Sequence, residues 1–419
     1  MIKTYAGIRG TVDFDPASTR LFNKISQKAR LLFELFGYKE IILPVLEEEG
    51  VFIRGVGEIT DIVEKQIFRI TNRSDSDTNI VLRPEGTAQV IRYYVENSLY
   101  KQSDFHKFSY VGPMFRGERP QKGRFRQFNH IGAESIGSDD FHLDAEIINL
   151  SINILESIGI TDKELKINSL GCVRDKENFS RALKQGLDAK RNELCQDCQR
   201  RLDKNPLRVV DCKEQKCKSV IAMLKLGQGN LCDDCKKNFN DLLGLLDILK
   251  IQYTYAPHLV RGLDYYTNTV FEITSKGLGS QDAIGAGGRY NNLVKDLGGP
   301  DIAAIGFALG IERILLLLKA TGDEEKIKVF VATTNKSLSY DAFNILKVLR
   351  EEKISCDTDY CGKSLKGQLR YAEKLGTRFV VIVGDEELKE GMVVLKDMTK
   401  STQEKIKIDN LVATLKNIC

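Results

Sequence analysis

Near the start of the chain, apolar residues recur at helical spacing and then give way to a strand pattern. From Ser18 an apolar residue returns every three or four positions as far as Phe36, and Gly37 follows as a stop signal. This spacing predicts a helix over 18–36. Residues 38–46 then have the pattern of a strand that contains Pro44, a residue tolerated mainly at a sheet edge or bulge. A helix followed by an edge strand is a candidate subunit contact, with an ordinary surface edge as the alternative.

Residues 110–134 predict a β-hairpin with a long basic loop. Apolar residues favour a strand that ends at Met114, Phe115 and Arg116, residues 117–123 favour a loop, and residues 124–134 favour a returning strand. Between 116 and 126 the only acid is Glu118, and the cations are Arg116, Arg119, Lys122, Arg124 and Arg126.

The returning strand places several chemical groups on one face. Side chains alternate along a strand, so Arg124, Phe128, His130 and Glu134 share a face if the strand is regular. A guanidinium suits phosphate, an aromatic ring suits a purine, and a carboxylate suits an amine or imidazole. The face therefore predicts a site for a nucleotide beside a cationic small molecule. A solvated basic hairpin is the alternative.

Three further segments carry groups that can bind a ligand. Residues 80–88 predict a strand that turns at Pro84, with Glu85 and Thr87 just before a helix. The Glu85 carboxylate is either an acid favoured by the helix dipole or a ligand for an ammonium group. Residues 269–273 favour a strand, and residues 285–290 are rich in glycine, which lets backbone approach a ligand closely. Residues 305–313 predict a glycine-kinked strand that enters a helix, with Arg313 near its start, where backbone N–H groups also favour phosphate.

Residues 175–250 differ in character from the rest and are predicted to be a mostly helical insertion. They are polar and rich in lysine, and they contain six of the chain's ten cysteines. Two Cys-x-x-Cys pairs predict a single zinc ion held by Cys195, Cys198, Cys232 and Cys235. Cys212 and Cys217 complicate this count, and six reduced cysteines without a metal are the alternative.

Beyond a polar linker at 321–326, the pattern is that of a small α/β domain with a buried sheet. Short apolar runs at 328–332 and 379–383 alternate with helical patterns at 340–352 and 365–375. Gly362, Lys363, Lys366 and Arg370 could contact phosphates, although a solvated helix face is the default interpretation.

Composition sets limits on the partners. At 419 residues the chain should form two or three domains, and 42% hydrophobic with 29% charged residues is typical of a folded, soluble protein. The net charge is only +4, so a nucleic acid would be bound by local basic surface. The start has no apolar signal segment, and Glu312 with Arg313 interrupts the apolar stretch 302–320. These features favour a cytoplasmic protein with reduced cysteines and no membrane span.

In chain order, these segments resemble the class II aminoacyl-tRNA synthetases, and specifically the bacterial histidyl-tRNA synthetase family. The three class motifs correspond to residues 37–46, to residues 115–118 with Arg124 and Phe128, and to residues 306–313. The histidine assignment rests on residues 82–87, 261–266 and 287–290. The resemblance implies an α+β fold: an antiparallel-sheet catalytic core over 1–325 with flanking helices, interrupted by the insertion, and an α/β anticodon-binding domain over 326–419.

For ATP, the resemblance implies phosphate contacts from three arginines and a purine site on the hairpin. Arg116 and Arg313 would hold the phosphates with Arg124 beside them, Phe128 would stack on adenine, and Glu118 would contact its amino group. Mg²⁺ is expected to accompany ATP.

For histidine, the resemblance implies that Glu85 and Thr87 bind the α-amino group and that Glu134 and Tyr266 bind the imidazole. Arg261 would stabilise the α-phosphate during attack. The remaining histidine-binding residues implied are His130, Tyr265 and Tyr290. The family often has glutamine at position 130, which leaves the contact made by His130 open.

The resemblance also implies partners and alternatives. The loop residues Arg119, Gln121 and Lys122 would contact the acceptor end of tRNA(His), and a homodimer is expected. One alternative is a non-catalytic regulatory paralogue that partners ATP phosphoribosyltransferase in histidine biosynthesis. The other is a class II synthetase for a different amino acid.

Overall fold

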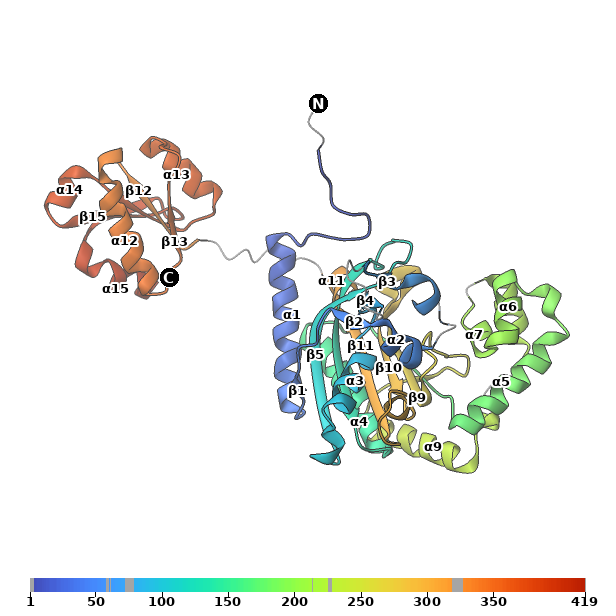
Figure 1. Ribbon diagram of the computed structural model, residues 1–419. Helices are drawn as coiled ribbons and strands as arrows, with labels where there is room; N and C mark the ends of the chain where they lie inside the picture. The colour runs from blue at the N-terminus through green and yellow to red at the C-terminus, as the bar shows by residue number, and fades with distance from the viewer. Residues whose placement is uncertain are drawn as a thin grey trace. The chain divides into compact units, whose positions relative to one another are not determined.

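The chain folds into two units, Met1–Ala320 and Thr321–Cys419. The computed structural model describes residues 4–57, 60, 62–71, 79–212, 214–224, 228–318 and 327–418 (Figure 1). The predicted linker at 321–326 lies outside the described residues. No helix among the described residues is long and apolar enough to cross a membrane.

An eight-stranded sheet forms the centre of the first unit, in the order β1-β5-β6-β11-β10-β9-β7-β8. Its interior pairs, from β5 to β7, are antiparallel, and the two short edge strands are parallel to their neighbours. The strands are β1 (Lys39–Glu40), β5 (His106–Phe115), β6 (Gln127–Ile136), β7 (Glu164–Ser169), β8 (Thr254–Tyr255), β9 (Thr267–Thr274), β10 (Ala283–Arg289) and β11 (Ala304–Gly310). The sheet confirms the predicted α+β class.

Side chains along the central strands point alternately to the two faces of the sheet. Ile131 and Ala133 of β6 pack with residues of α1 (Pro16–Leu35), α4 (Phe141–Ser157) and α9 (Asp233–Ile248). The even-numbered residues Phe128, His130 and Glu134 lie on the opposite face of β6. That face is covered by α2 (Glu49–Val56), α3 (Thr87–Glu96) and α10 (Leu293–Asp296).

The predicted hairpin is confirmed, with one boundary shifted. Strands β5 and β6 pair in register from His106 with Ile136 to Phe115 with Gln127. The returning strand begins at Gln127 and not at residue 124. Backbone bonds between Gln121 and Arg124 close a turn of their own, and Gly123 has a φ of +74° there. Arg124 is therefore in the loop and not in the strand.

The continuous strand predicted over 38–46 is wrong. The segment divides between β1, at the edge of the large sheet, and β2 (Leu46–Glu48), in a separate sheet with β3 (Phe68–Arg69) and β4 (Ile80–Leu82). Between them the Leu43 and Pro44 carbonyls accept hydrogen bonds from Arg83, which also donates to the Pro113 carbonyl. Pro44 has no N–H, and the carbonyls of residues 43 and 44 already bond to a side chain. These two residues therefore do not pair with a neighbouring strand.

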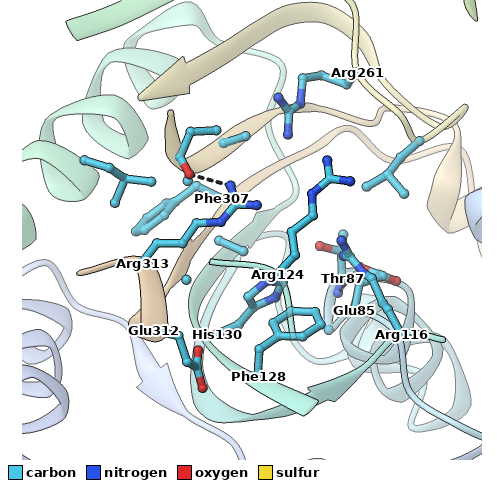
Figure 2. Close-up of a pocket in the computed structure, with 18 of the residues that line it drawn as sticks. Glu85, Thr87, Arg116, Arg124, Phe128, His130, Arg261, Phe307, Glu312 and Arg313 are labelled. Atoms are coloured by element: carbon cyan, nitrogen blue, oxygen red, sulfur yellow. Dashed lines mark hydrogen bonds between the residues drawn. The ribbon is translucent and has the colours of Figure 1, made fainter. Parts of the chain in front are cut away.

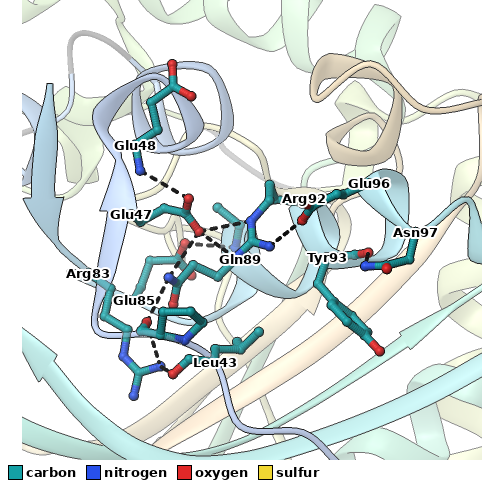
Figure 3. Close-up of polar contacts among 12 residues, drawn as sticks. Leu43, Glu47, Glu48, Arg83, Glu85, Gln89, Arg92, Tyr93, Glu96 and Asn97 are labelled. Carbon is teal, nitrogen blue, oxygen red and sulfur yellow. Dashed lines mark hydrogen bonds and ion pairs between the residues drawn. The ribbon is translucent and has the colours of Figure 1, made fainter. Parts of the chain in front are cut away.

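A polar network fastens the same segment to α3 (Figure 3). Gln89 donates to the Pro44 carbonyl at 3.0 Å, and Arg92 pairs with Glu47 at 2.7 Å. Because α3 begins beside the cavity described below, these bonds fix the position of its first turn.

The insertion is helical, as predicted. The predicted range holds α5 (Val173–Asp188), α6 (Gln196–Lys204), α7 (Leu207–Val210), α8 (Gln215–Ala222) and α9. Buried leucine and valine residues of α5, α7 and α8 continue one of the two apolar clusters of the first unit.

The second unit is an α/β domain, and its predicted elements are confirmed within a residue or two. Its sheet order is β13-β12-β14-β15-β16, with the first three strands parallel and the last two antiparallel. The elements are β12 (Val329–Thr333), α12 (Ser339–Glu351), β13 (Cys356–Thr358), α13 (Leu365–Lys374), β14 (Phe379–Val383), α14 (Asp385–Lys389), β15 (Met392–Asp397), β16 (Thr402–Lys407) and α15 (Ile408–Ile418).

Candidate active site

One open cavity of about 900 Å³ brings together residues from distant parts of the first unit. Its walls come from the first turn of α3, the β5–β6 hairpin, residues 261–266, β10, β11 and the start of α11 (Ile311–Leu317). Arg116, Arg261 and Arg313 line it together, and Figure 2 shows them around one space with Arg124. The cavity is open to solvent, and both cationic and acidic side chains line it.

Two arginines of this cavity are held by backbone carbonyls. Arg116 donates through Nε to the Pro84 carbonyl at 3.0 Å, and Arg313 donates through Nε to the Gly123 carbonyl at 3.0 Å. Burial lowers the pKa of both guanidiniums. Such a penalty on a buried cation is offset when an anion binds beside it.

In the structure, the Arg116 side chain lies beside Phe128, where a purine was predicted to stack. The Arg116 guanidinium lies 5.1 Å from the centre of the Phe128 ring. Arg124 pairs with Glu118 at 3.2 Å, and all four residues line the cavity. A purine that stacks on Phe128 would therefore have an arginine as its neighbour.

Arg261 reaches the cavity from the segment before β9. It forms an ion pair with Glu272 through Nη1. Its Nε is buried and has no hydrogen-bond partner among the described residues. An N–H group in this state can donate to a bound ligand.

Glu85 and Thr87 lie at the first turn of α3, and both line the cavity. The Glu85 carboxylate accepts the backbone N–H groups of Thr87 and Ala88 at 2.7 and 2.9 Å. The helix-terminal acid that was one of the two interpretations of Glu85 is thus observed. Burial raises the pKa of Glu85.

Glu134 is fully buried behind the cavity wall. Its carboxylate accepts the hydroxyls of Thr87 at 2.7 Å, Tyr110 at 3.2 Å and Tyr290. Thr87 and Tyr110 line the cavity, whereas Glu134 and Tyr290 are not among its lining residues. Burial raises the pKa of Glu134 to about 8.

Gly306 makes room for the Glu134 carboxylate. It lies opposite Glu134 in the β6–β11 pairing, and a Cβ at position 306 would be 1.7 Å from Glu134 Oε2. The glycine of the third motif is thus required for packing against the buried acid.

Aromatic and polar rings complete the inner wall. Tyr265 and Tyr266 are buried cavity residues whose ring centres lie 4.7 Å apart. His130 lines the cavity, and its Nδ1 is buried without a hydrogen-bond partner among the described residues. Burial and the charges of Arg116 and Arg313 hold the pKa of His130 well below its usual range, so the ring is neutral.

The remaining predicted residues lie outside the cavity. Arg119, Gln121 and Lys122 are exposed in the hairpin loop. Arg289, from the third histidine-specific segment, forms a buried ion pair with Asp144.

Several residues that position the site were not predicted. Arg83 joins the 43–44 segment to β5, and Glu312 accepts both the backbone and the side-chain N–H groups of Asn129. Lys176 of α5 donates to the carbonyls of Asp264 and Tyr266 at 2.6 and 2.9 Å. Arg83 and Glu312 lie within two of the motif segments. Their roles were not predicted, because no sequence pattern marks a charged side chain that hydrogen-bonds to backbone groups.

The prediction that two Cys-x-x-Cys pairs share one metal is wrong. Cys195 and Cys198 cluster with Cys212 and Cys217, whereas Cys232 and Cys235 cluster with Cys172 and Asp175. The first pair lies at the start of α6, which packs on α7, and the second lies at the start of α9, beside the start of α5. Cys172 and Asp175 were missed because Cys172 lies before the insertion and Asp175 is not a typical zinc-knuckle residue.

Comparisons with known proteins cover nearly the whole chain. A family model for histidyl-tRNA synthetase matches residues 10–314, and an anticodon binding domain model matches residues 328–418. The histidine–tRNA ligase of Halothermothrix orenii is 44% identical over 414 residues, which are 98% of each chain. A crystal structure of apo histidyl-tRNA synthetase from S. aureus has a TM-score of 0.80 at 33% identity, over 99% of this chain and 100% of that one.

A structure from Bacillus halodurans is similar in fold. It is described as an ATP phosphoribosyltransferase regulatory subunit/histidyl-tRNA synthetase and has a TM-score of 0.66, over 92% of this chain and 99% of that one. At 19% identity this is a likeness of fold alone.

Proposed function

The chain belongs to the histidyl-tRNA synthetase family and attaches histidine to tRNA, and from this premise we propose how its cavity carries out the reaction. The histidine carboxylate attacks the α-phosphorus of ATP in line, pyrophosphate leaves, and histidyl-adenylate remains. A hydroxyl of the terminal ribose of tRNA(His) then attacks the acyl carbonyl, and AMP leaves. The observation that carries the proposal is the shared cavity of Arg116, Arg261 and Arg313.

Positioning and cationic stabilisation are the main requirements of the first step, because both reactants are anionic. Arg116 and Arg313 bind the phosphates of ATP, with Arg124 beside them. Arg261 donates to the α-phosphate as charge develops on it. The carbonyl contacts of Arg116 and Arg313 support this assignment, since they hold the two cations in place before ATP binds.

The adenine ring stacks beside Phe128, and Glu118 contacts its amino group. Magnesium arrives with ATP. Of the cavity carboxylates, Glu118 already faces Arg124, and Glu312 accepts the Asn129 N–H groups. The ion would therefore be held mainly by phosphate oxygens and by the waters that Mg²⁺ retains.

Histidine binds at the end of the cavity where the buried acids lie. Glu85 and Thr87 bind its α-amino group, and His130, Tyr265 and Tyr266 form the wall of the imidazole pocket. Glu134 and Tyr290 lie behind this wall and support it. Glu134 acts through Thr87 and Tyr110, whose hydroxyls it orients. An apolar analogue would leave these buried polar groups unpaired, which costs about four orders of magnitude in specificity.

We propose that tRNA contacts both units. Arg119, Gln121 and Lys122 contact the acceptor end, and their exposure in the hairpin loop supports this role. The α/β unit binds the anticodon, as its family match suggests. Transfer RNA charging would take place in the cytoplasm.

We propose that the protein is a homodimer through α1 and the segment after it. Apolar side chains are exposed there, with Leu35 80% and Ile42 95% exposed. Exposed apolar groups on an edge segment are a common feature of subunit contacts.

We also propose that Cys195, Cys198, Cys212 and Cys217 bind one structural zinc ion. Their sulfur atoms all lie within 4.8 Å of one another, and Cys195 Sγ is 3.9 Å from Cys212 Sγ. A zinc–sulfur bond of about 2.3 Å gives a tetrahedron with an edge of about 3.8 Å. The Cys195 N–H donates to Cys217 Sγ at 3.2 Å, which favours a thiolate.

An exchange assay tests the proposed function. With purified protein, pyrophosphate should exchange into ATP in the presence of histidine and not with the other amino acids tested one at a time. Exchange with another amino acid would reject the histidine assignment. A folded sample without any exchange would support the regulatory alternative.

A further inference from the structure

We propose that Cys172, Asp175, Cys232 and Cys235 bind a second zinc ion, separate from the Cys195 cluster. One ligand atom from each of the four lies within 4.8 Å of all the others. Zinc is bound by thiolates at about 2.3 Å and by carboxylates at about 2.0–2.2 Å, so neighbouring ligands are about 3.5–3.8 Å apart. Zinc binding would draw the four atoms together to this spacing. Three thiolates favour zinc over magnesium or calcium, which prefer oxygen ligands.

The two helices that supply these ligands point their positive ends at the cluster. Cys172 is the N-cap of α5 and Cys232 is the N-cap of α9, while Asp175 and Cys235 lie in the first turns. The Cys172 N–H donates to Cys235 Sγ at 3.3 Å. Helix N-termini and backbone N–H groups stabilise thiolate and carboxylate charge, so this position suits deprotonated ligands.

The environment of the Asp175 carboxylate independently indicates that a cation binds there. The residue is only 2% exposed, and its Oδ2 is buried without a hydrogen-bond partner among the described residues. A buried carboxylate oxygen in this state is costly unless a cation binds it. Gly171 is required for this approach, because a Cβ there would be 2.5 Å from Asp175 Cβ.

A route to the cluster and an outer support are also present. A cavity of about 480 Å³ beside the cluster is lined by Cys172, Cys235 and Asn268, among others, and gives an ion access. In the protonated state the Cys235 thiol donates to Asn268 Oδ1 at 3.6 Å. Once the sulfur is a thiolate, rotation of the amide by 180° would let Asn268 Nδ2 donate to it. Metal sites commonly have such outer partners, which hold the ligands in place.

The position of the cluster gives the ion a specific role. Cys172 immediately precedes α5 and Cys232 immediately precedes α9, so one ion there would join the two ends of the helical segment α5–α8. Lys176, in the same first turn of α5, donates to the carbonyls of Asp264 and Tyr266. The second zinc would therefore hold the segment between Arg261 and Tyr266, which lines the active-site cavity, against the insertion.

Metal analysis of full-length protein tests this proposal without requiring activity. After purification under reducing conditions and removal of loose metal, elemental mass spectrometry should find two zinc ions per chain. The variant Cys232→Ser/Cys235→Ser and the variant Cys212→Ser/Cys217→Ser should each retain one, and the control Cys356→Ser/Cys361→Ser should retain two. One zinc in the wild type that survives Cys232→Ser/Cys235→Ser would overturn the proposal. So would one zinc lost in both insertion variants, because the two pairs would then share it.

The variant Asp175→Asn separates the loss of a metal ligand from loss of metal through misfolding. The substitution keeps the side-chain shape but weakens one ligand, so a chromogenic chelator should take one of the two zinc ions faster than from the wild type. Its circular dichroism should be unchanged. Identical release of both zinc ions from wild type and variant would overturn the proposal.

Discussion

Replacing Arg261 with alanine separates a role in the transition state from a role in binding. Arg261 lines the cavity, pairs with Glu272 through Nη1, and has a buried Nε without a partner among the described residues. Removing one donor that is aimed at developing charge costs about 3 kcal/mol, or roughly a hundredfold in rate. We therefore expect Arg261→Ala to slow adenylate formation about a hundredfold and to weaken histidine binding far less.

The ion partner must be controlled, because the substitution also removes a contact of Glu272. The Glu272 side chain is about one-fifth exposed, so water can solvate the unpaired carboxylate in part. Glu272→Gln keeps the cation and a hydrogen-bond acceptor, and we expect it to retain most of the rate. If Glu272→Gln were as slow as Arg261→Ala, the ion pair and not the cation would be the requirement.

The assay measures the two roles separately. Single-turnover quench experiments with labelled ATP give the rate of adenylate formation, and calorimetry gives the affinity for histidine. A loss confined to the rate indicates an interaction made in the transition state. Equal losses in rate and affinity would refute the reasoning and assign Arg261 to substrate binding.

Two further predictions concern the buried acid and the subunit contact. Since burial raises the pKa of Glu134 from 4.5 to about 8, its contribution to stability is full below pH 4.5 and is lost as pH rises to about 8. Relative to Glu134→Gln, the free energy of unfolding of the wild type should therefore fall progressively across this window, by up to roughly 5 kcal/mol. Thermal unfolding at a series of pH values measures this difference. A difference that does not change with pH would show that the acid is not desolvated. Ile42→Asp should shift the protein from dimer to monomer in analytical ultracentrifugation, because it places a charge on a 95% exposed apolar side chain. Unchanged sedimentation would exclude this segment from the interface.

Local patterns predicted the elements better than their connections. The long helix α1, the hairpin and the α/β elements of the second unit all follow from periodicity and turn residues that lie within a few positions of one another. Residues 38–46 failed because their conformation depends on Arg83, which is about forty positions away and takes the carbonyls that a strand would pair.

The site shows the same division between local and distant information. Motif likeness indicated which arginines belong to the cavity, since each lies in a short segment with its own signature. It did not indicate that Glu134 lies behind the wall, because its burial depends on Gly306 in another strand. The predicted set of metal ligands was wrong for a related reason. The two Cys-x-x-Cys pairs look equivalent in sequence, but helix packing places each pair beside two different residues.

The electrostatics of the free cavity indicate that it is organised in advance for its reactants. Burial opposes the charge of Arg116 and Arg313 on one side and that of Glu85 and Glu134 on the other. A core selected for stability alone would avoid such groups, because unpaired buried charge is costly. Here backbone carbonyls orient the cations, while N–H groups and hydroxyls orient the acids, so little reorganisation remains when ATP and histidine bind. Under the proposed assignment, the cost of burying these charged groups would be recovered when anionic phosphates bind beside the arginines and a cationic amine binds beside the acids.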